Sequence, residues 1–317
     1  MFELVFLGTA ASAPSVWRNL PSTLVFHEDS RFIVDVGEGT QRQLLKSGVG
    51  FKRLNTVLLT HGHLDHILGL GGLISTFARW EAMDTFDIYG GKATLDRVRD
   101  LLKVVLRGGE VRVKINLIEI EPGVLLRGKG VTVSAFPVNH RGGSSFGFSF
   151  EEPDRRPFLV EAAEALGVPA GPERRELVAG RSVTLASGVV VHPEQVLGPT
   201  IPGAKVVYIG DISRTDGLVE AARGADALVT EATYASADAD LARDFGHITA
   251  AQAAMIARAA GVRYLYLNHI SRRYSGRELE AEARAIFPHA MVVDDLDHFR
   301  VTRDGPPQRV IRSDEGR

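Results

Sequence analysis

The sequence THGHLDH, residues 60–66, stands at the end of the apolar run NTVLLT, residues 55–60. Three histidines and an aspartate therefore fall within six residues directly after an expected strand. Imidazoles packed so densely repel one another when protonated and add little to a core when neutral. A histidine-rich surface turn is the plain alternative. The spacing H-x-H-x-D-H directly after a strand instead suits one or two transition-metal ions.

Side chains of the same ligand types follow three other apolar runs. His140 closes FPVNH, Asp211 closes VVYIGD and His269 closes YLYLNH. If these strands are neighbours, their ends meet at one rim and give a shared site. The candidate ligands are seven in all: His61, His63, Asp65, His66, His140, Asp211 and His269. That number exceeds the needs of one tetrahedral zinc and suits two ions that share a carboxylate and a water.

Asp35 follows the run FIV and is expected to accept a hydrogen bond from one ligand imidazole. Such a carboxylate orients the ring and fixes which nitrogen binds the metal. The alternative is an ordinary turn aspartate before Gly37.

The chain of 317 residues contains no cysteine, which excludes disulfide partners and thiolate ligands. Histidine and carboxylate remain as the strong metal ligands, and a cytoplasmic location is expected. No run approaches the roughly 18 to 20 apolar residues of a membrane span, so no membrane partner is expected. Residues 1–14 lack a basic leader and are interpreted as a first strand rather than a signal peptide. The net charge of −2 means that a nucleic-acid partner needs a local basic patch.

Apolar strand-type and amphipathic helix-type segments alternate in both halves of the chain. Strands are expected at 3–8, 22–27, 31–37, 55–60, 86–90, 111–121, 131–140, 144–152, 204–211, 227–233 and 263–269. Helices are expected at 39–48, 66–80, 92–106, 217–224, 249–261 and 277–287. This α/β pattern favours two sheets packed face to face with helices outside.

The sequence pattern changes at residues 152–200, where prolines and glycines are scattered and the alternation of expected strands and helices stops. This segment is interpreted as an insertion that projects from a body formed by residues 1–151 and 201–303. The polar tail, residues 304–317, is expected to be loose.

The sequence resembles the metallo-β-lactamase superfamily and, within it, the short-form tRNase Z (RNase Z) family of tRNA 3′-processing endoribonucleases. The resemblance reaches to about residue 303 and rests on FLGTAASAP, DVGEGTQRQL, THGHLDHILGLGGL, PVNH, YIGD, TEAT, HIT and NHISRRY. THGHLDH marks the superfamily, whereas the insertion between His140 and Asp211 marks the family. The resemblance implies an αββα sandwich of two mixed sheets. It also implies a flexible arm, residues 152–200, that clamps the tRNA elbow, and a homodimer in which one subunit's arm grips the tRNA that the other subunit cuts.

The resemblance also implies how two zinc ions per subunit are held. His61, His63 and His140 would bind one ion; Asp65, His66 and His269 would bind the other; Asp211 would bridge them. Two such ions lower the pKa of a shared water towards ~7. The implied reaction is attack by hydroxide after the discriminator nucleotide of precursor tRNA, with Asp65 taking the proton. The products would be tRNA with a 3′-OH and a trailer with a 5′-phosphate.

The leaving oxygen needs a proton donor. In the family, the glutamate of an H-E-A-T motif orients the histidine of an H-S-T motif. The matching catalytic residues here are Glu231 in TEAT and His247 in HIT, while Thr230 and Ile248 depart from the two motifs. The alternative is that His247 caps the helix that begins TAAQ.

Substrate contacts are expected at three places. Arg273 in NHISRRY suits a phosphate oxygen, or else a surface ion pair. Arg18 and Asn19 in PSVWRN match the family's P-x-K-x-R-N loop, linked to sensing the CCA end, but Val16 replaces its lysine. At the arm's centre, Gly171, Pro172, Arg174 and Arg175 are expected to meet phosphates through backbone N–H groups and guanidinium groups.

Two other functions share parts of this pattern. A phosphodiesterase or esterase of the same fold that acts on small molecules, such as a thioester hydrolase, would keep the metal motif but has no use for the arm. A non-catalytic RNA-binding scaffold would keep the arm but should have lost ligands, and all seven are present.

Overall fold

The computed structural model describes residues 1–80, 83–106, 113–141 and 143–311. The described chain forms two compact units, one built from Met1–Glu151 together with the chain from Ala204 onward, the other from Glu152–Gly203. We call the first unit the body and the second the arm. Each is described by itself.

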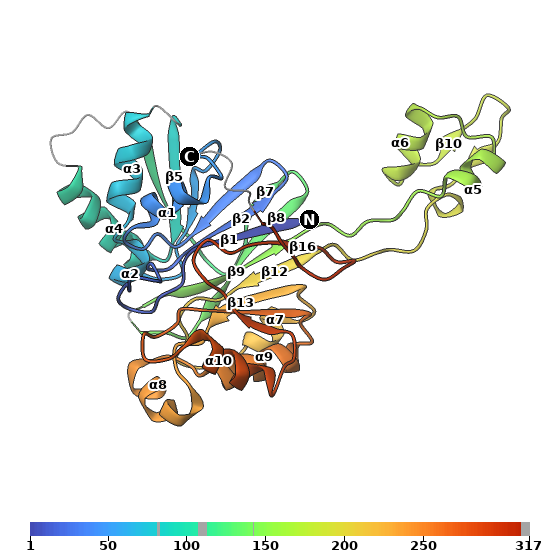
Figure 1. Ribbon diagram of the computed structural model, residues 1–317. Helices are drawn as coiled ribbons and strands as arrows, with labels where there is room; N and C mark the ends of the chain where they lie inside the picture. The colour runs from blue at the N-terminus through green and yellow to red at the C-terminus, as the bar shows by residue number, and fades with distance from the viewer. Residues whose placement is uncertain (81–82, 107–112, 142, 312–317) are drawn as a thin grey trace. The chain divides into compact units, whose positions relative to one another are not determined.

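The described part of the body contains two β-sheets, with helices on their outer faces (Figure 1). The first sheet has the strand order β17-β16-β1-β2-β3-β4-β5-β6. Its strands are β1 (Phe2–Gly8), β2 (Ser22–His27), β3 (Ser30–Val34), β4 (Thr56–Leu58), β5 (Thr85–Gly90), β6 (Lys114–Glu119), β16 (His298–Val301) and β17 (Gln308–Arg309). Strands β3 to β6 run parallel, and the remaining pairs are antiparallel, so the sheet is mixed.

The second sheet has the order β15-β14-β13-β12-β9-β8-β7 and is mixed as well. Its strands are β7 (Gly123–Gly128), β8 (Val131–Val138), β9 (Ser145–Glu151), β12 (Lys205–Tyr208), β13 (Ala227–Glu231), β14 (Tyr264–Asn268) and β15 (Ala290–Val292). The insertion falls between β9 and β12, which are antiparallel neighbours with Glu151 opposite Lys205.

The faces of the two sheets pack against each other through a core rich in phenylalanine. Strand β1 shows how the alternation of a strand divides its side chains. Phe2, Leu4 and Phe6 enter the core shared by the two sheets, whereas Val5 and Leu7 pack with the outer helices. Because both faces of this strand are covered, its sequence is a nearly continuous apolar run.

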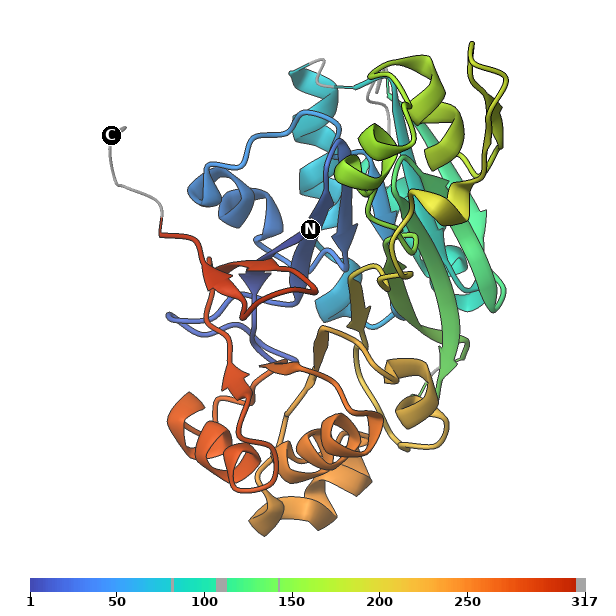
Figure 2. The ribbon, with the colours of Figure 1, turned by 90° about the vertical axis from the view of Figure 1, so that its right-hand side faces the viewer.

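Helices cover the outer face of each sheet. Helices α1 (Thr40–Ser47), α3 (Leu70–Arg79) and α4 (Lys92–Val105) share a core with the first sheet. Helices α7 (Leu218–Ala222), α9 (Ala250–Ala260) and α10 (Gly276–Arg284) do the same for the second sheet. The helices of the C-terminal half, orange to red, lie together on their own side of the sheets in both views (Figures 1 and 2). This layering confirms the predicted αββα sandwich.

Several local expectations differ from the structure. The predicted helix 66–80 is divided into α2 (Leu64–Ile67) and α3. At the break, a Cβ on Gly69 would lie 2.0 Å from the carbonyl oxygen of Gly37, so the two backbones touch there. Helix α8 (Ala239–Phe245), which follows the 3₁₀ turn η2 (Ser236–Asp238), was not predicted.

The tail was expected to be loose, but β17 within it pairs with β16, and Val310 N–H donates to the carbonyl oxygen of His298. The free edge of β16 thus captures this polar segment through its backbone. Residues 312–317, and the first two residues of the strand expected at 111–121, lie outside the described residues. No helix in the described ranges is long and apolar enough to cross a membrane.

The arm has its own secondary structure, which was not predicted from the sequence. It contains α5 (Val160–Ala165), α6 (Pro172–Val178), β10 (Val183–Thr184), β11 (Val190–Val191) and the 3₁₀ turn η1 (Pro193–Gln195). A small apolar core holds them together, made of Ala163, Val168, Leu177, Val191 and Val196. Backbone bridges Arg155–Ile201 and Phe158–Leu197 join its two ends.

Candidate metal centre

The seven candidate ligands come together where four strands end. Residues 60–66 follow β4, His140 follows β8, Asp211 follows β12 and His269 follows β14. Ligand-type atoms of His61, His63, His140 and Asp211 lie within 4.8 Å of one another, and so do those of Asp65, His66 and His269. These side chains are buried or half-buried.

Asp211 lies between the two groups and turns one carboxylate oxygen towards each. Its Oδ2 is 3.6 Å from Nε2 of His61 and 3.7 Å from Nε2 of His140. Its Oδ1 is 3.4 Å from Nε2 of His66 and 3.3 Å from Nε2 of His269. A carboxylate in this position can donate one oxygen to each of two ions.

The donor atoms also have the spacing that a metal requires. Nδ1 of His63 is 2.9 Å from Nε2 of His61 and 3.3 Å from Nε2 of His140. Oδ2 of Asp65 is 3.6 Å from Nε2 of His66 and 3.4 Å from Nε2 of His269. Metal–ligand bonds of about 2.0–2.1 Å in a tetrahedron place the ligand atoms about 3.3 Å apart. The histidine and aspartate atoms therefore fit metal ions.

Two buried polar atoms support the same conclusion. Nε2 of His66 and Oδ1 of Asp211 have no hydrogen-bond partner among the described residues. A buried polar atom without a partner costs free energy unless something satisfies it. Both atoms point into the cluster, where a cation would satisfy them.

The opposite ring nitrogens are held by hydrogen-bond partners, which leaves Nε2 free to bind. Nδ1 of His66 lies 2.8 Å from Oδ2 of Asp35. Nδ1 of three other rings lies close to an oxygen: 3.0 Å in His61 from Thr60 Oγ1, 3.0 Å in His140 from the Gly246 carbonyl and 2.9 Å in His269 from Thr233 Oγ1. Partners of this kind set the tautomer and the orientation of a ligand imidazole.

Asp35 organises more of the site than a turn aspartate would. Its carboxylate accepts from the Thr60 N–H and from the Thr60 hydroxyl, each at 2.8 Å, in addition to its contact with His66. Thr60, Thr233 and Gly246 were not predicted as site residues. Thr60 directly precedes His61, and Thr233 ends the TEAT motif, so adjacency to a candidate ligand or motif was the signal available.

The backbone is strained at two of these positions. Asp35 has φ 58° and His269 has φ 55°, a left-handed conformation that residues other than glycine rarely adopt. Conformations of this kind persist where surrounding contacts hold them, and they cluster at functional sites. Here each one aims a polar side chain into the cluster.

Burial keeps the imidazoles of His61, His63 and His140 neutral. It lowers the pKa of His61 well below the ordinary value, and it lowers the pKa of His63 and His140 as well. Burial raises the pKa of Asp211, but the imidazoles of His269, His66 and His61 lower it well below the ordinary range. Neutral imidazoles and an ionised carboxylate are the forms that bind metal.

His66 differs from these three histidines. Burial lowers its pKa, but Asp211, Asp35 and Asp65 raise it well above the ordinary value. His66 thus holds a proton that an incoming cation would displace.

His247 stands beside the cluster with Glu231. Its Nδ1 lies 3.2 Å from both carboxylate oxygens of Glu231 and 3.9 Å from Oδ2 of Asp211. Glu231 is itself fixed, because it accepts from Ile212 N–H at 2.5 Å, from the Thr233 hydroxyl at 2.5 Å and from Ile248 N–H at 3.3 Å. Burial lowers the pKa of His247, but the charge and hydrogen bond of Glu231 outweigh it and raise the pKa to about 9.

The alternative role of His247 as a helix cap is wrong. Helix α9 is capped by Thr249, whose side chain accepts from Gln252 N–H, while the Gln252 side chain accepts from Thr249 N–H. His247 has no part in this capping box.

The structure does not bring Arg18 and Asn19 into the cluster. The Arg18 guanidinium donates to Thr9 Oγ1, to the Val293 carbonyl and to Asp294 Oδ1, each at 2.6 Å. Asn19 donates through its backbone N–H to Asp295 and through Nδ2 to the Glu38 carbonyl. These groups shape the loop between β1 and β2. Arg273 is exposed on the turn before α10 and forms no ion pair with any other described residue.

The predicted arm residues lie at the start of α6. Gly171 is its N-cap and Pro172 its first residue. Arg174 is half-buried: it donates to the Val168 carbonyl and lies over the Phe158 ring. Arg175 is exposed, and no described residue pairs with it. Of the two predicted arginines, Arg175 is thus the one whose guanidinium is available to a ligand.

Comparisons with known proteins agree with this fold and site. A family model described as Metallo-beta-lactamase superfamily matches residues 17–156, and one described as Beta-lactamase superfamily domain matches residues 168–270. The metallo-beta-lactamase fold protein YhfI from Bacillus subtilis superposes with a TM-score of 0.67 at 20% identity, covering 94% of this chain and 98% of that one. The four layers and the histidine–aspartate cluster at the strand ends are those of a metallo-β-lactamase superfamily protein.

Relatives of higher sequence identity show which family of this superfamily the chain belongs to. A Ribonuclease Z of Bradyrhizobium diazoefficiens is 47% identical, over 95% of this chain and all of the relative, and one of Geobacillus kaustophilus is 36% identical over 95% and 99%. The short form of human tRNase Z superposes with a TM-score of 0.66 at 25% identity, covering 94% of this chain and 99% of that one. The chain belongs to the ribonuclease Z family.

Proposed function

We propose that this chain is a metal-dependent endoribonuclease that removes 3′ trailers from precursor tRNA by hydrolysis after the discriminator nucleotide. The observation that carries the proposal is the Asp211 carboxylate, which faces two separate groups of imidazoles with one oxygen each. Two-ion sites of this kind suit in-line hydrolysis of phosphodiesters. The relatives' name, Ribonuclease Z, supports RNA as the substrate.

The metal we propose is zinc, two ions per subunit. His61, His63 and His140 would hold one ion, and Asp65, His66 and His269 the other, with Asp211 shared. Nitrogen-rich sets at tetrahedral spacing favour zinc over magnesium or calcium, which prefer oxygen ligands. When bound, such ions lower the pKa of water towards neutrality and stabilise charge on phosphoryl oxygens. From the family resemblance we further propose a cytoplasmic homodimer, which a molar-mass measurement in solution would test.

Two side chains would move the protons. Asp65, held by the Ser12 N–H at 3.1 Å, is half-buried and suits the role of acceptor for the proton of the attacking water. His247 donates through Nδ1 to Glu231, which leaves its Nε2 to protonate the departing 3′ oxygen. A pKa of about 9 keeps His247 charged at neutral pH, as an acid must be.

The test is cleavage of a precursor tRNA that carries a 3′ trailer, with both product ends mapped and metal content measured on the same preparation. We expect one cut after the discriminator nucleotide, a tRNA 3′-OH, a trailer 5′-phosphate and about two zinc ions per chain. Hydrolysis of small esters without tRNA cleavage would favour the small-molecule hydrolase. Tight tRNA binding without cleavage by the zinc-loaded protein would favour the non-catalytic scaffold.

The arm provides a separate prediction about binding. Glu151 and Lys205 face each other across β9 and β12, so a short Gly-Ser linker can replace Pro153–Pro202 without stretching the sheet. We expect KM for precursor tRNA to rise by about tenfold or more, because contacts far from the reacting phosphorus act equally in the ground and transition states. Hydrolysis of a small phosphodiester should stay near the wild-type rate, since all seven ligands lie in the body.

Single substitutions refine the arm experiment. Arg175→Ala removes an exposed guanidinium that pairs with none of the described residues, whereas Arg181→Ala removes one that pairs with Glu176 at 2.5 Å. The first should weaken tRNA binding more than the second and make it less sensitive to salt. Normal processing of precursor tRNA by the armless variant would contradict the clamp role, and loss of activity on both substrates would indicate that the arm supports the fold.

A further inference from the structure

Arg97 of helix α4 is fixed at the edge of the metal centre. Its Nη1 donates to the carbonyl oxygen of Gly62 at 2.7 Å, and Gly62 stands between the ligand candidates His61 and His63. A Cβ on Gly62 would lie 3.1 Å from Cα of Thr94 and 3.3 Å from Cδ of Arg97, so the helix packs directly on this loop. The Arg97 side chain is exposed, and no other described residue accepts from its guanidinium.

Arg141, which directly follows the ligand candidate His140, is also fixed by a main-chain carbonyl group. Its Nη2 donates to the carbonyl oxygen of Asp244. A Cβ on Gly246 would lie 3.1 Å from Nε of Arg141, so the guanidinium packs against the residue that precedes His247. Arg141 is exposed as well. A second arginine therefore borders the group of ligand candidates that contains His140.

The two arginines belong to one rim, because the segments that carry them pack together. A Cβ on Gly91, the N-cap of α4, would lie 2.7 Å from the carbonyl oxygen of Ser144, three residues after Arg141. The imidazole rings of His63 and His140, which adjoin the two arginines in sequence or in space, have centroids 4.9 Å apart. One ligand can therefore contact both guanidinium groups.

We call Arg97 and Arg141 the arginine pair. Neither forms an ion pair with an acidic residue in the described ranges. Burial lowers the pKa of His63, and the charge of Arg97 lowers it further. The pair thus adds positive potential at a cluster that would hold cations, which opposes their binding. An arrangement that opposes the site beside it becomes favourable when an anion covers it.

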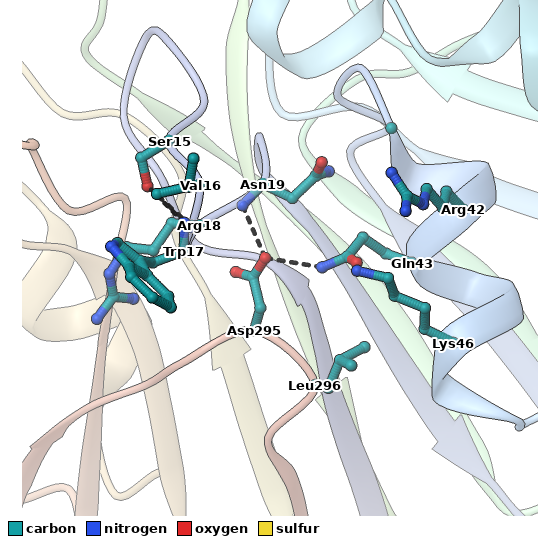
Figure 3. Close-up of a pocket in the computed structure, with 11 residues that line it drawn as sticks. Ser15, Val16, Trp17, Arg18, Asn19, Arg42, Gln43, Lys46, Asp295 and Leu296 are labelled. Atoms are coloured by element: carbon teal, nitrogen blue, oxygen red, sulfur yellow. Dashed lines mark hydrogen bonds between the residues drawn. The ribbon is translucent and has the colours of Figure 1, made fainter.

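A nearby cavity shows a different use of an arginine. The cavity lies between helix α1 and the loop that joins β1 to β2, has a volume of about 450 Å³, and is lined by Arg18 and Asp295 among others. Arg18 pairs with Asp294 at 2.6 Å, and Figure 3 shows Asp295 accepting hydrogen bonds from Asn19 and Gln43. The charge of Arg18 is neutralised within the protein, whereas the arginine pair keeps its charge for a ligand.

The position of His247 indicates which part of the substrate lies against the pair. In the proposed reaction His247 protonates the departing 3′ oxygen, and that oxygen stays on the mature tRNA. Arg141 packs on Gly246, and its bond to the Asp244 carbonyl holds the chain three residues before His247. The arginine pair therefore borders the side of the metal centre that faces the mature end of the tRNA.

We propose that Arg97 and Arg141 hold backbone phosphates at the mature end of the tRNA, next to the phosphodiester that is cut. Guanidinium groups bind phosphate oxygens through two N–H donors at once, and such contacts position a nucleic acid without reading its sequence. A guanidinium that is already fixed loses little entropy on binding. This inference rests on the proposed function, and the experiments below distinguish the failure of one from the failure of the other.

Binding of mature tRNA to the zinc-loaded protein is the direct test, with fluorescence anisotropy of an end-labelled tRNA as the measurement. In Arg97→Gln/Arg141→Gln, the slope of log affinity against log salt should fall in magnitude by about 1.4–1.8, since each lost phosphate contact contributes about 0.7–0.9. Each single substitution should give about half this change. Arg99→Gln is the matched control, because Arg99 is an exposed arginine of α4 that pairs with Asp96. It should change the slope little.

Kinetics separate substrate binding from support of the metal centre. Arg97→Gln/Arg141→Gln should raise KM for precursor tRNA by roughly 10- to 100-fold, the usual contribution of hydrogen bonds between charged groups. The factor should be the same for trailers of one and of ten nucleotides, because the mature end is common to both. A small phosphodiester, which has no flanking phosphate, should be affected far less. Arg97→Lys/Arg141→Lys should recover part of the loss, since it keeps the charge but not the planar fork.

An unchanged salt slope for mature tRNA, or a KM equal to that of the wild type, would overturn the inference. A loss of zinc, or an equal loss on the small phosphodiester, would also overturn it, because the pair would then support the ligand loop. A loss that grows with trailer length would place the contacts on the trailer and count against the mature end. If mature tRNA shows the expected change of slope but no precursor is cut, the proposed function alone fails and the pair remains a tRNA-binding element.

Discussion

Asp211→Ala should abolish cleavage of precursor tRNA, with a rate reduced by more than about 10³-fold, and should release metal from the protein. The reason is geometric, because the two carboxylate oxygens of Asp211 each face a different pair of imidazoles at 3.3–3.7 Å. Removing a ligand that contacts a single ion would weaken the binding of that ion only. Removing this side chain takes a donor from both groups at once.

The measurement is zinc per chain by mass spectrometry together with the cleavage rate, with circular dichroism to confirm folding. Asp216→Ala is the matched control, since Asp216 is an exposed carboxylate five residues away that pairs with Arg214. It should keep full metal content and activity. Two zinc ions per chain and wild-type cleavage in Asp211→Ala would rule out the shared-carboxylate assignment.

His247→Ala should lower kcat for precursor tRNA by roughly 10²–10⁴-fold, the usual contribution of an acid that protonates a leaving group. Metal content should be retained, because Nδ1 of His247 is held by Glu231 rather than by the ligand set. A nitrophenyl phosphodiester should be affected far less, since its leaving oxygen needs no proton. Equal losses on both substrates would show that His247 has a structural role.

Glu231 provides an internal check on this prediction. If its carboxylate acts by orienting and charging His247, then Glu231→Gln should reduce kcat by itself but add little to His247→Ala. Residues that work as a unit show this kind of non-additivity. If the free-energy losses in kcat from the two substitutions were fully additive, Glu231 and His247 would act independently of each other.

The candidate ligands could be predicted from the sequence because they follow four apolar strands, either directly or within a few residues, and neighbouring strands bring their ends together. Their hydrogen-bond partners could not be predicted so well. The hydroxyls of Thr60 and Thr233 and the carbonyl of Gly246 are groups that occur throughout any chain, and their roles depend on distances across the fold.

Arg18 shows a different limit. Its place in the PSVWRN motif suggested a substrate contact, yet its guanidinium turns inward to Thr9, Val293 and Asp294. Two of these three partners, Val293 and Asp294, are 275 and 276 positions away in the sequence, so no local pattern reveals the direction of this side chain. The same holds for the break at Gly69, because the Gly37 backbone lies against it only in the folded chain.

The way the arm is inserted has a consequence for how the chain folds. Pairing of β9 with β12 unites segments separated by the whole arm, and the entropy of closing such a long loop slows the search for that contact. The backbone bridge Arg155–Ile201 and the arm's own apolar core allow the arm to close on itself first. The two strands then meet as if a short hairpin joined them, so the catalytic sheet can assemble at the speed of a local contact.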